Sequence, residues 1–152
     1  MHFDVIDDEA IIRDLMREII AQEGYGVKTF ASADDYAAYF SSPSYEAPIA
    51  VLSDILMPGM NGISLVRYIH ERSPEQKVVL ISGTPEDISE IDGELCAVIG
   101  KPFHPARVIG LLKALKQCKD CEPCCSNTPP GQCRYGIGHA CPMHRQADDS
   151  KN

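Results

Sequence analysis

Polar residues that could transfer a phosphoryl group follow four short apolar runs of the chain. Asp7 and Asp8 come after the first run, Asp54 after a later one, and Ser82 and Lys101 after two more. Carboxylate oxygens, with water and substrate oxygens, are the ligands that Mg²⁺ prefers. Lys101 and Ser82 could contact the oxygens of a phosphoryl group, which leaves Asp54 as the nucleophile that forms an acyl phosphate. If they converge, these residues predict phosphorylation of Asp54 with Mg²⁺ as cofactor.

Thiols and imidazoles near the end of the chain form a second set of reactive side chains. The candidate metal ligands are Cys118, Cys121, Cys124, Cys125, Cys133, His139, Cys141 and His144. Apolar residues are almost absent between them, so this segment cannot fold by hydrophobic burial alone. In a reducing compartment closely spaced thiols favour a metal, and tetrahedral zinc sites take four such ligands each. The pattern predicts a zinc-binding tail. The alternatives are an iron–sulfur cluster, or a metal-free tail that is reduced, disulfide-forming or disordered and could act as a thiol redox switch.

The elements that must position the first set alternate between strands and helices. Short apolar runs predict strands at residues 1–6, 27–30, 49–53, 78–81 and 97–99. Apolar residues three and four apart predict helices from residue 10 to the glycines at 24 and 26, and at 63–72 and 105–116. Ser32 and Asp35 predict a capped helix that reaches residue 40, and a brief helix is expected at 85–91. The order is a strand followed by a helix, five times.

This alternation predicts an α/β fold, a doubly wound parallel sheet of five strands with helices on both faces. Ligands of such sheets bind at the carboxyl ends of the strands, where the polar residues named first would lie. We therefore expect one domain over residues 1–117 and a Cys/His-rich metal-binding tail over residues 118–152.

Composition and charge argue against several classes of function. The chain has 152 residues and a net charge of −8, a balance that disfavours binding to nucleic acid. No apolar stretch approaches the ~18 residues of a membrane-spanning helix. The first residues lack the basic and apolar regions of a signal peptide, so we expect a cytoplasmic protein.

Four motifs, in order, resemble those of the receiver domains of two-component response regulators. They are VIDDE at residues 5–9, SDILMPGMNG at 53–62, VLISG at 79–83 and KPF at 101–103. The resemblance covers roughly residues 1–117. It implies a phosphoacceptor protein rather than an enzyme that acts on other substrates, with a sensor histidine kinase or a phosphotransfer protein as phosphodonor.

The resemblance also implies a role for each matching residue. Asp54 would be the phosphoacceptor, Ser82 the switch hydroxyl and Lys101 the contact to the phosphoryl group. The Mg²⁺ ligands would be Asp7, Asp8, Asp54 and the backbone carbonyl of Leu56. The peptide bond between Lys101 and Pro102 would be cis.

Two departures from the family pattern concern the output. Val98 stands three positions before the lysine, where the family has an aromatic residue, so the family's aromatic rotation cannot occur in that form. Only 18 residues separate Ser82 from Lys101, which predicts a short or partly unwound fourth helix.

The sequence thus favours a single-domain response regulator that is phosphorylated on Asp54 and signals by contact with an unknown downstream protein. The tail would be a zinc-stapled interaction module. One alternative is a redox or metal sensor whose tail is the input that controls the receiver. Another is a phosphorelay intermediate that passes its phosphoryl group to a second histidine.

Overall fold

The computed structural model describes residues 1–83, 95 and 97–120 of the chain. The elements in this part are β1 (His2–Ile6), α1 (Ala10–Gln22), β2 (Gly26–Phe30), α2 (Ala33–Phe40), β3 (Val51–Asp54), α3 (Gly62–Arg72), β4 (Val78–Ser82), β5 (Ala97–Gly100) and α4 (Pro105–Asp120). The strands form one sheet in the order β2-β1-β3-β4-β5. All neighbouring strands are parallel. The predicted five-stranded parallel sheet is confirmed, and the helix expected at 85–91 lies outside the described residues.

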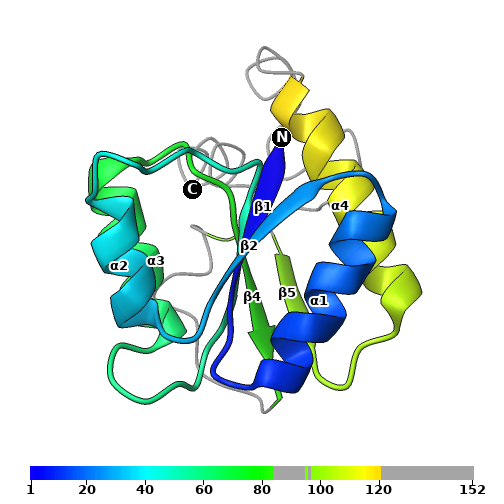
Figure 1. The fold of residues 1–152 in the computed structure, drawn as a ribbon, viewed down its shortest axis with the longest axis horizontal. Helices are drawn as coiled ribbons and strands as arrows, with labels where there is room; N and C mark the ends of the chain where they lie inside the picture. The colour runs from blue at the N-terminus through cyan, green and yellow to red at the C-terminus, as the bar shows by residue number, and fades with distance from the viewer. Residues whose placement is uncertain (84–94, 96, 121–152) are drawn as a thin grey trace, which may run out of the picture.

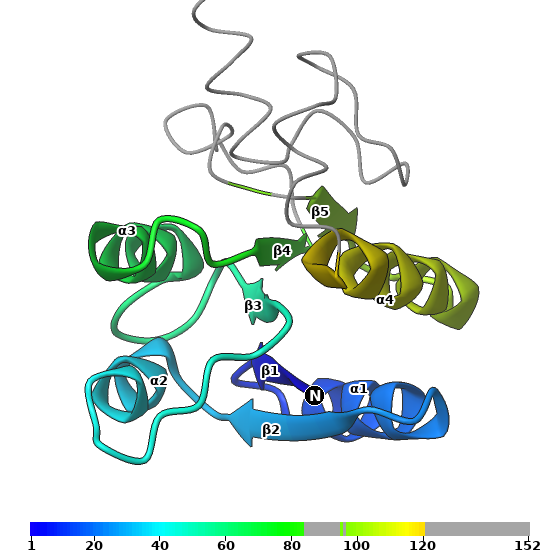
Figure 2. The same cartoon turned by 90° about the horizontal axis from the view of Figure 1, so that it is seen from above.

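Helices cover both faces of the sheet. Figure 2 shows α1 and α4 on one face and α2 and α3 on the other. Alternate residues of β1 point to opposite faces, as the two-residue period of a strand requires. Phe3 and Val5 pack in the core beneath α1 and α4, whereas Ile6 packs in the core beneath α2 and α3. This double covering explains why the strands read as nearly continuous apolar runs.

Local capping determines where two of the helices begin. The hydroxyl of Ser32 accepts a hydrogen bond from the backbone N–H of Asp35 at 3.0 Å, which confirms the predicted cap of α2. The side chain of Asn61 accepts one from the N–H of Ser64 at 2.8 Å, so α3 begins at Gly62, one residue before the predicted start. At the other end of the chain, α4 reaches Asp120, four residues beyond the predicted 116.

The carboxyl ends of four strands meet at one edge of the sheet. Asp7 follows β1, Asp54 ends β3, Ser82 ends β4 and Lys101 follows β5. Strand order reverses between β1 and β3, because the chain passes from β1 outward to β2 and then returns to the far side of β1. Such a reversal opens a crevice beyond the strand ends, which is where open α/β sheets bind ligands.

Candidate functional site

Four acidic side chains gather at this edge. Asp7, Asp8, Glu9 and Asp54 each offer a carboxylate oxygen, and these oxygens all lie within 4.8 Å of one another. Asp7 and Asp54 are buried, whereas Asp8 and Glu9 are exposed. Sequence reasoning named three of these acids and missed Glu9. Its position directly after the two aspartates was the available signal, but only the turn after β1 brings its carboxylate back toward the group.

Lys101 supplies the positive charge within this acidic cluster. Its Nζ lies 3.0 Å from Oδ2 of Asp7, 3.4 Å from Oδ2 of Asp54 and 3.7 Å from Oε1 of Glu9. The backbone N–H of Lys101 donates to the carbonyl of Ser82 at 2.7 Å, which holds the end of β5 against β4. The peptide bond between Lys101 and Pro102 is cis, as the resemblance implied. Residues from three strand ends are thus brought into direct contact.

The ionisation of Asp54 and Lys101 follows from their surroundings. Burial, and then the negative charge of Asp7, raise the pKa of Asp54 above its usual value, although Lys101 and the N–H of Ile55 act against them. That N–H donates to Oδ1 of Asp54 at 2.8 Å. Burial lowers the pKa of Lys101, but its hydrogen bond to Asp7 and the nearby carboxylates outweigh burial and raise the pKa overall. Lys101 is therefore a firmly protonated counter-ion for the two buried acids.

A pocket of about 180 Å³ opens beside Asp54. Its lining residues are Asp8, Glu9, Asp54, Ile55, Leu56, Ser82 and Gly83. Its polar lining comes from the carboxylates of Asp8, Glu9 and Asp54 and from Ser82. The oxygen-rich donor set fits Mg²⁺, and the exposed side leaves room for water or substrate oxygens to complete an octahedral shell. At about 180 Å³, the pocket is also large enough to admit a phosphoryl group between Asp54 and Ser82.

A second hollow, more apolar, lies next to the first. It measures about 380 Å³ and is lined by Ile12, Leu15, Gly83, Lys101, Pro102 and Phe103. Ile11, on the same helix, exposes 79% of its surface. An apolar groove between α1 and the segment after β5 therefore borders the polar pocket.

Arg13 stabilises the turn after β1 that carries Asp7, Asp8 and Glu9. Nη1 of Arg13 donates to the backbone carbonyl of Asp7 at 2.7 Å, and the N–H of Glu9 donates to Oδ1 of Asp7 at 2.9 Å. Arg13 was not among the predicted site residues, because its role depends on a backbone carbonyl that no side-chain motif reveals.

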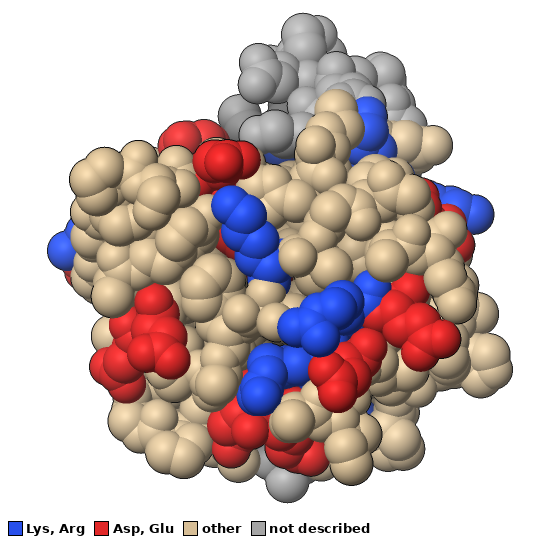
Figure 3. Space-filling view, in the orientation of Figure 1, with Lys and Arg blue, Asp and Glu red and all other residues tan. Residues whose placement is uncertain are grey.

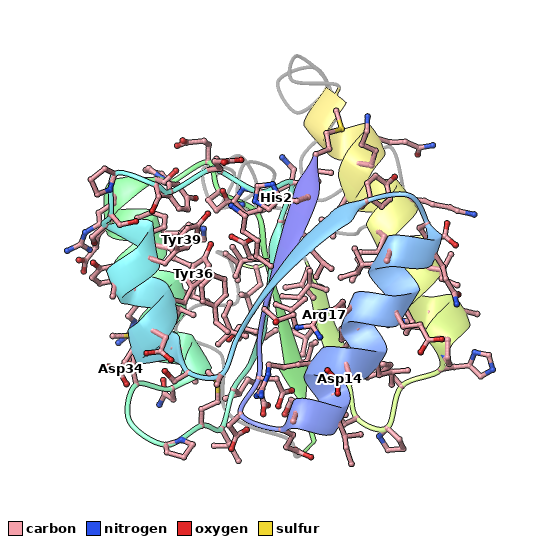
Figure 4. The ribbon with its side chains drawn as sticks, in the orientation of Figure 1. His2, Asp14, Arg17, Asp34, Tyr36 and Tyr39 are labelled. Atoms are coloured by element: carbon pink, nitrogen blue, oxygen red, sulfur yellow. The ribbon has the colours of Figure 1, made fainter. Side chains whose placement is uncertain are left out.

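Elsewhere on α1, Arg17 pairs with Asp14 at 3.1 Å, and Figure 4 shows these two side chains near each other. Acidic and basic side chains are interspersed on the face drawn in Figure 3.

The candidate ligands of the tail fall outside this site. Cys118 belongs to the last turn of α4. The other predicted ligands, from Cys121 to His144, lie outside the described residues, as does Cys96. No described helix has the length and apolar character needed to cross a membrane.

Comparison with curated proteins gives relatives that share this part of the chain. The transcriptional regulatory protein AruR of Pseudomonas aeruginosa is 32% identical over 116 residues, which are 73% of this chain and 47% of AruR. The transcriptional regulatory protein ResD of Bacillus subtilis is 31% identical over 114 residues, which are 73% of this chain and 46% of ResD. The chain spans about half the length of these relatives.

Solved structures share the fold. A CheY-like response regulator receiver domain protein of Methanospirillum hungatei superposes with a TM-score of 0.71 at 26% identity, covering 80% of this chain and 97% of that one. The response regulator protein TrrA of Thermotoga maritima, solved in complex with Mg²⁺ and BeF, gives 0.66 at 25% identity, covering 75% and 97%. The family model described as the response regulator receiver domain matches residues 4–113. The chain therefore belongs to the response regulator receiver family, whose members are phosphoacceptors of two-component systems and bind Mg²⁺ in an acidic pocket of this kind.

Proposed function

We propose that this protein is a response regulator that accepts a phosphoryl group on Asp54 from a histidine kinase or a phosphotransfer protein. The observation that carries the proposal is the contact of Lys101 Nζ with both buried acids, 3.0 Å from Asp7 and 3.4 Å from Asp54, at the mouth of an oxygen-lined pocket. A structural ion pair would need one acid. Two acids around one lysine, beside further exposed carboxylates, form a site suited to a cation and an anionic group together.

In this proposal a carboxylate oxygen of Asp54 attacks the phosphorus of a phosphohistidine. The new bond is an acyl phosphate, and the broken phosphorus–nitrogen bond leaves its electron pair on the donor's imidazole. Lys101 stabilises negative charge on the transferred oxygens, and the Ser82 hydroxyl donates a hydrogen bond to one of them. Asp7, Asp8, Asp54 and the carbonyl of Leu56 would hold Mg²⁺. When bound, Mg²⁺ supplies further charge neutralisation at the same oxygens.

The phosphodonor would approach over α1. The apolar groove beside Lys101 and the exposed Ile11 offer a protein partner an apolar contact next to the pocket. Apolar patches with a polar rim are typical of protein interaction sites.

We propose that the tail is a zinc-stapled module through which the protein contacts a downstream protein. Val98 supports an output other than the family's aromatic switch, because this β5 residue exposes 37% of a small aliphatic side chain in place of an aromatic ring.

The cysteine spacing also favours a second function, a redox or metal sensor in which the tail controls the receiver. A change of Asp54 phosphorylation with thiol oxidation or metal loss would support the sensor, and unchanged kinetics would contradict it.

Replacement of the phosphoacceptor tests the main proposal. Asp54→Asn should abolish acyl phosphate formation because an amide is not a competent nucleophile. The measurement is the mass increase of the intact protein after incubation with acetyl phosphate and Mg²⁺, followed by loss of that mass in hydroxylamine. Asp35→Asn, an exposed acid away from the site, is the matched control and should label as the wild type does. Labelling of Asp54→Asn at the wild-type rate would refute the assignment.

A further inference from the structure

The loop between β3 and α3 follows Asp54 directly and carries Leu56, whose carbonyl is a proposed Mg²⁺ ligand. Backbone hydrogen bonds fix its two ends. The N–H of Ile55 donates to the carbonyl of Ile81 at 3.2 Å, and the N–H of Gly62 donates to the carbonyl of Ile55 at 2.8 Å. Ile55 and Met57 are also buried. Pro58 and Gly59 are exposed and Met60 is only partly buried against the core, so a further contact is needed to hold the backbone of this stretch.

Asp34, in the first turn of α2, makes that contact. Its Oδ2 accepts a hydrogen bond from the backbone N–H of Met60 at 3.2 Å. Gly59 has φ of +79°, and a Cβ placed there would lie 2.5 Å from the same oxygen. The glycine thus allows the loop to turn and lets the carboxylate approach it. Figure 4 shows Asp34 at the end of α2 that faces this loop.

The helix that carries Asp34 is itself attached to β1. Tyr36, fully buried two residues further along α2, donates its hydroxyl proton to Oδ2 of Asp4 at 2.8 Å. Asp4 lies on β1, the strand that leads into Asp7 and Asp8. The start of α2 is therefore fixed relative to the strand that leads into Asp7 and Asp8. Asp34 in turn fixes the loop that carries the Leu56 carbonyl relative to α2.

We propose that Asp34 is a positioning residue of the Mg²⁺ site, which holds the loop between β3 and α3 so that the Leu56 carbonyl faces the carboxylates of Asp8 and Asp54. This inference rests on the proposed function, because it takes the Leu56 carbonyl as a ligand. Groups that orient metal ligands contribute to affinity without touching the metal.

The test compares Mg²⁺ affinity among variants of the full chain, measured by calorimetric titration with magnesium chloride. Asp34→Ala should raise the Kd for Mg²⁺ about two- to tenfold, the range that one hydrogen bond corresponds to. Asp34→Asn keeps an oxygen acceptor at the same place and should restore most of the affinity. Asp35→Ala removes a neighbouring acid of the same helix turn and is the matched control for net charge and helix dipole, so its Kd should equal that of the wild type.

Thermal unfolding without Mg²⁺ separates positioning from stability. Asp34 is exposed, so Asp34→Ala and Asp35→Ala should unfold at similar temperatures while their Mg²⁺ affinities differ. Equal Kd values for these two variants would overturn the inference, as would a Kd for Asp34→Asn as high as that for Asp34→Ala. The acyl phosphate assay on the wild type tests the proposed function separately, since the Kd comparison needs no phosphorylation. A wild-type chain that binds no Mg²⁺ would overturn both.

Discussion

Asp4 is a buried carboxyl group that phosphoryl transfer does not use. It is fully buried on β1, accepts the Tyr36 hydroxyl at 2.8 Å and lies 3.3 Å from Nε2 of His2. Figure 4 shows His2 at the start of β1. Burial raises the pKa of Asp4 from 3.8 to about 6, even though the hydrogen bond from Tyr36 and the charge of Lys28 act against it. Between pH 3.8 and about 6, Asp4 is therefore protonated in the folded protein and ionised in the unfolded chain.

This raised pKa makes stability depend on pH. The stabilising contribution is present below pH 4 and is lost as pH rises through about 6, because the folded state disfavours the charged form. Asp4→Asn stays neutral and keeps an acceptor for Tyr36. We expect its free energy of unfolding, relative to that of the wild type, to increase by about 3 kcal/mol between pH 4 and pH 7 and then to level off.

Urea unfolding across this pH range measures the difference. Subtracting the wild-type curve removes most contributions from titrating groups that do not contact Asp4. His2 contacts Asp4, and its pKa is lowered first by burial and then by the charge of Lys28. A flat difference for Asp4→Asn would contradict the burial argument.

At the scale of elements, the junction between β3 and α3 depends on the absence of a side chain at one position. A Cβ on Gly62 would overlap the backbone carbonyl oxygen of Asp54, and backbone atoms cannot move aside as a flexible side chain can. Gly62 therefore lets the first turn of α3 pack against the end of β3, the strand that carries the proposed phosphoacceptor Asp54. A change that moves the start of α3 should therefore also move Asp54.

Gly62→Ala should therefore destabilise the protein by about 2–4 kcal/mol and slow acyl phosphate formation, because the strand end must shift. Gly110, within α4, is the matched control, since a Cβ there meets nothing within 4 Å. Gly110→Ala should stabilise the protein by about 1 kcal/mol through helix propensity. Thermal unfolding and the acetyl phosphate assay measure both effects. Equal stabilities of the two variants would exclude close packing at Gly62.

At the scale of the whole molecule, the two parts of the chain differ in what can hold them together. Residues 1–117 supply two apolar cores, one on each face of the sheet. Residues 118–152 have six cysteines and two histidines and almost no apolar side chains. Free energy for ordering the second part must then come from metal–ligand bonds or from a partner rather than from burial.

The zinc proposal is tested by elemental analysis and an absorption spectrum of full-length protein purified anaerobically without added metal. We expect one or two zinc ions per chain and no visible colour, since four thiolate or imidazole ligands complete each site. Joint replacement of Cys124 and Cys125 by serine should lower the zinc content, whereas Cys96→Ser should leave it unchanged. Iron with charge-transfer absorbance, or protein without metal, would contradict the zinc proposal, and iron would favour the redox sensor.

The sequence by itself determined the parallel sheet, the order of its elements and the convergence of Asp7, Asp8, Asp54, Ser82 and Lys101. These features follow from local periodicity and from one topological rule, because parallel strands necessarily place their carboxyl ends at the same edge. Each can be read within a window of a few residues.

Tertiary structure decided the contacts between residues far apart in the chain. Tyr36 and Asp4 are 32 residues apart, and Met60 and Asp34 are 26 apart. His70, at the end of α3, is buried, and its Nε2 lies 2.7 Å from the carbonyl of Gln76. Such contacts have no sequence period, since they depend on how a helix packs on the sheet and on which backbone groups the loops leave to be paired. The sequence therefore determined most of the residues that meet at the proposed phosphoacceptor site, except Glu9, and packing decided which other residues support them.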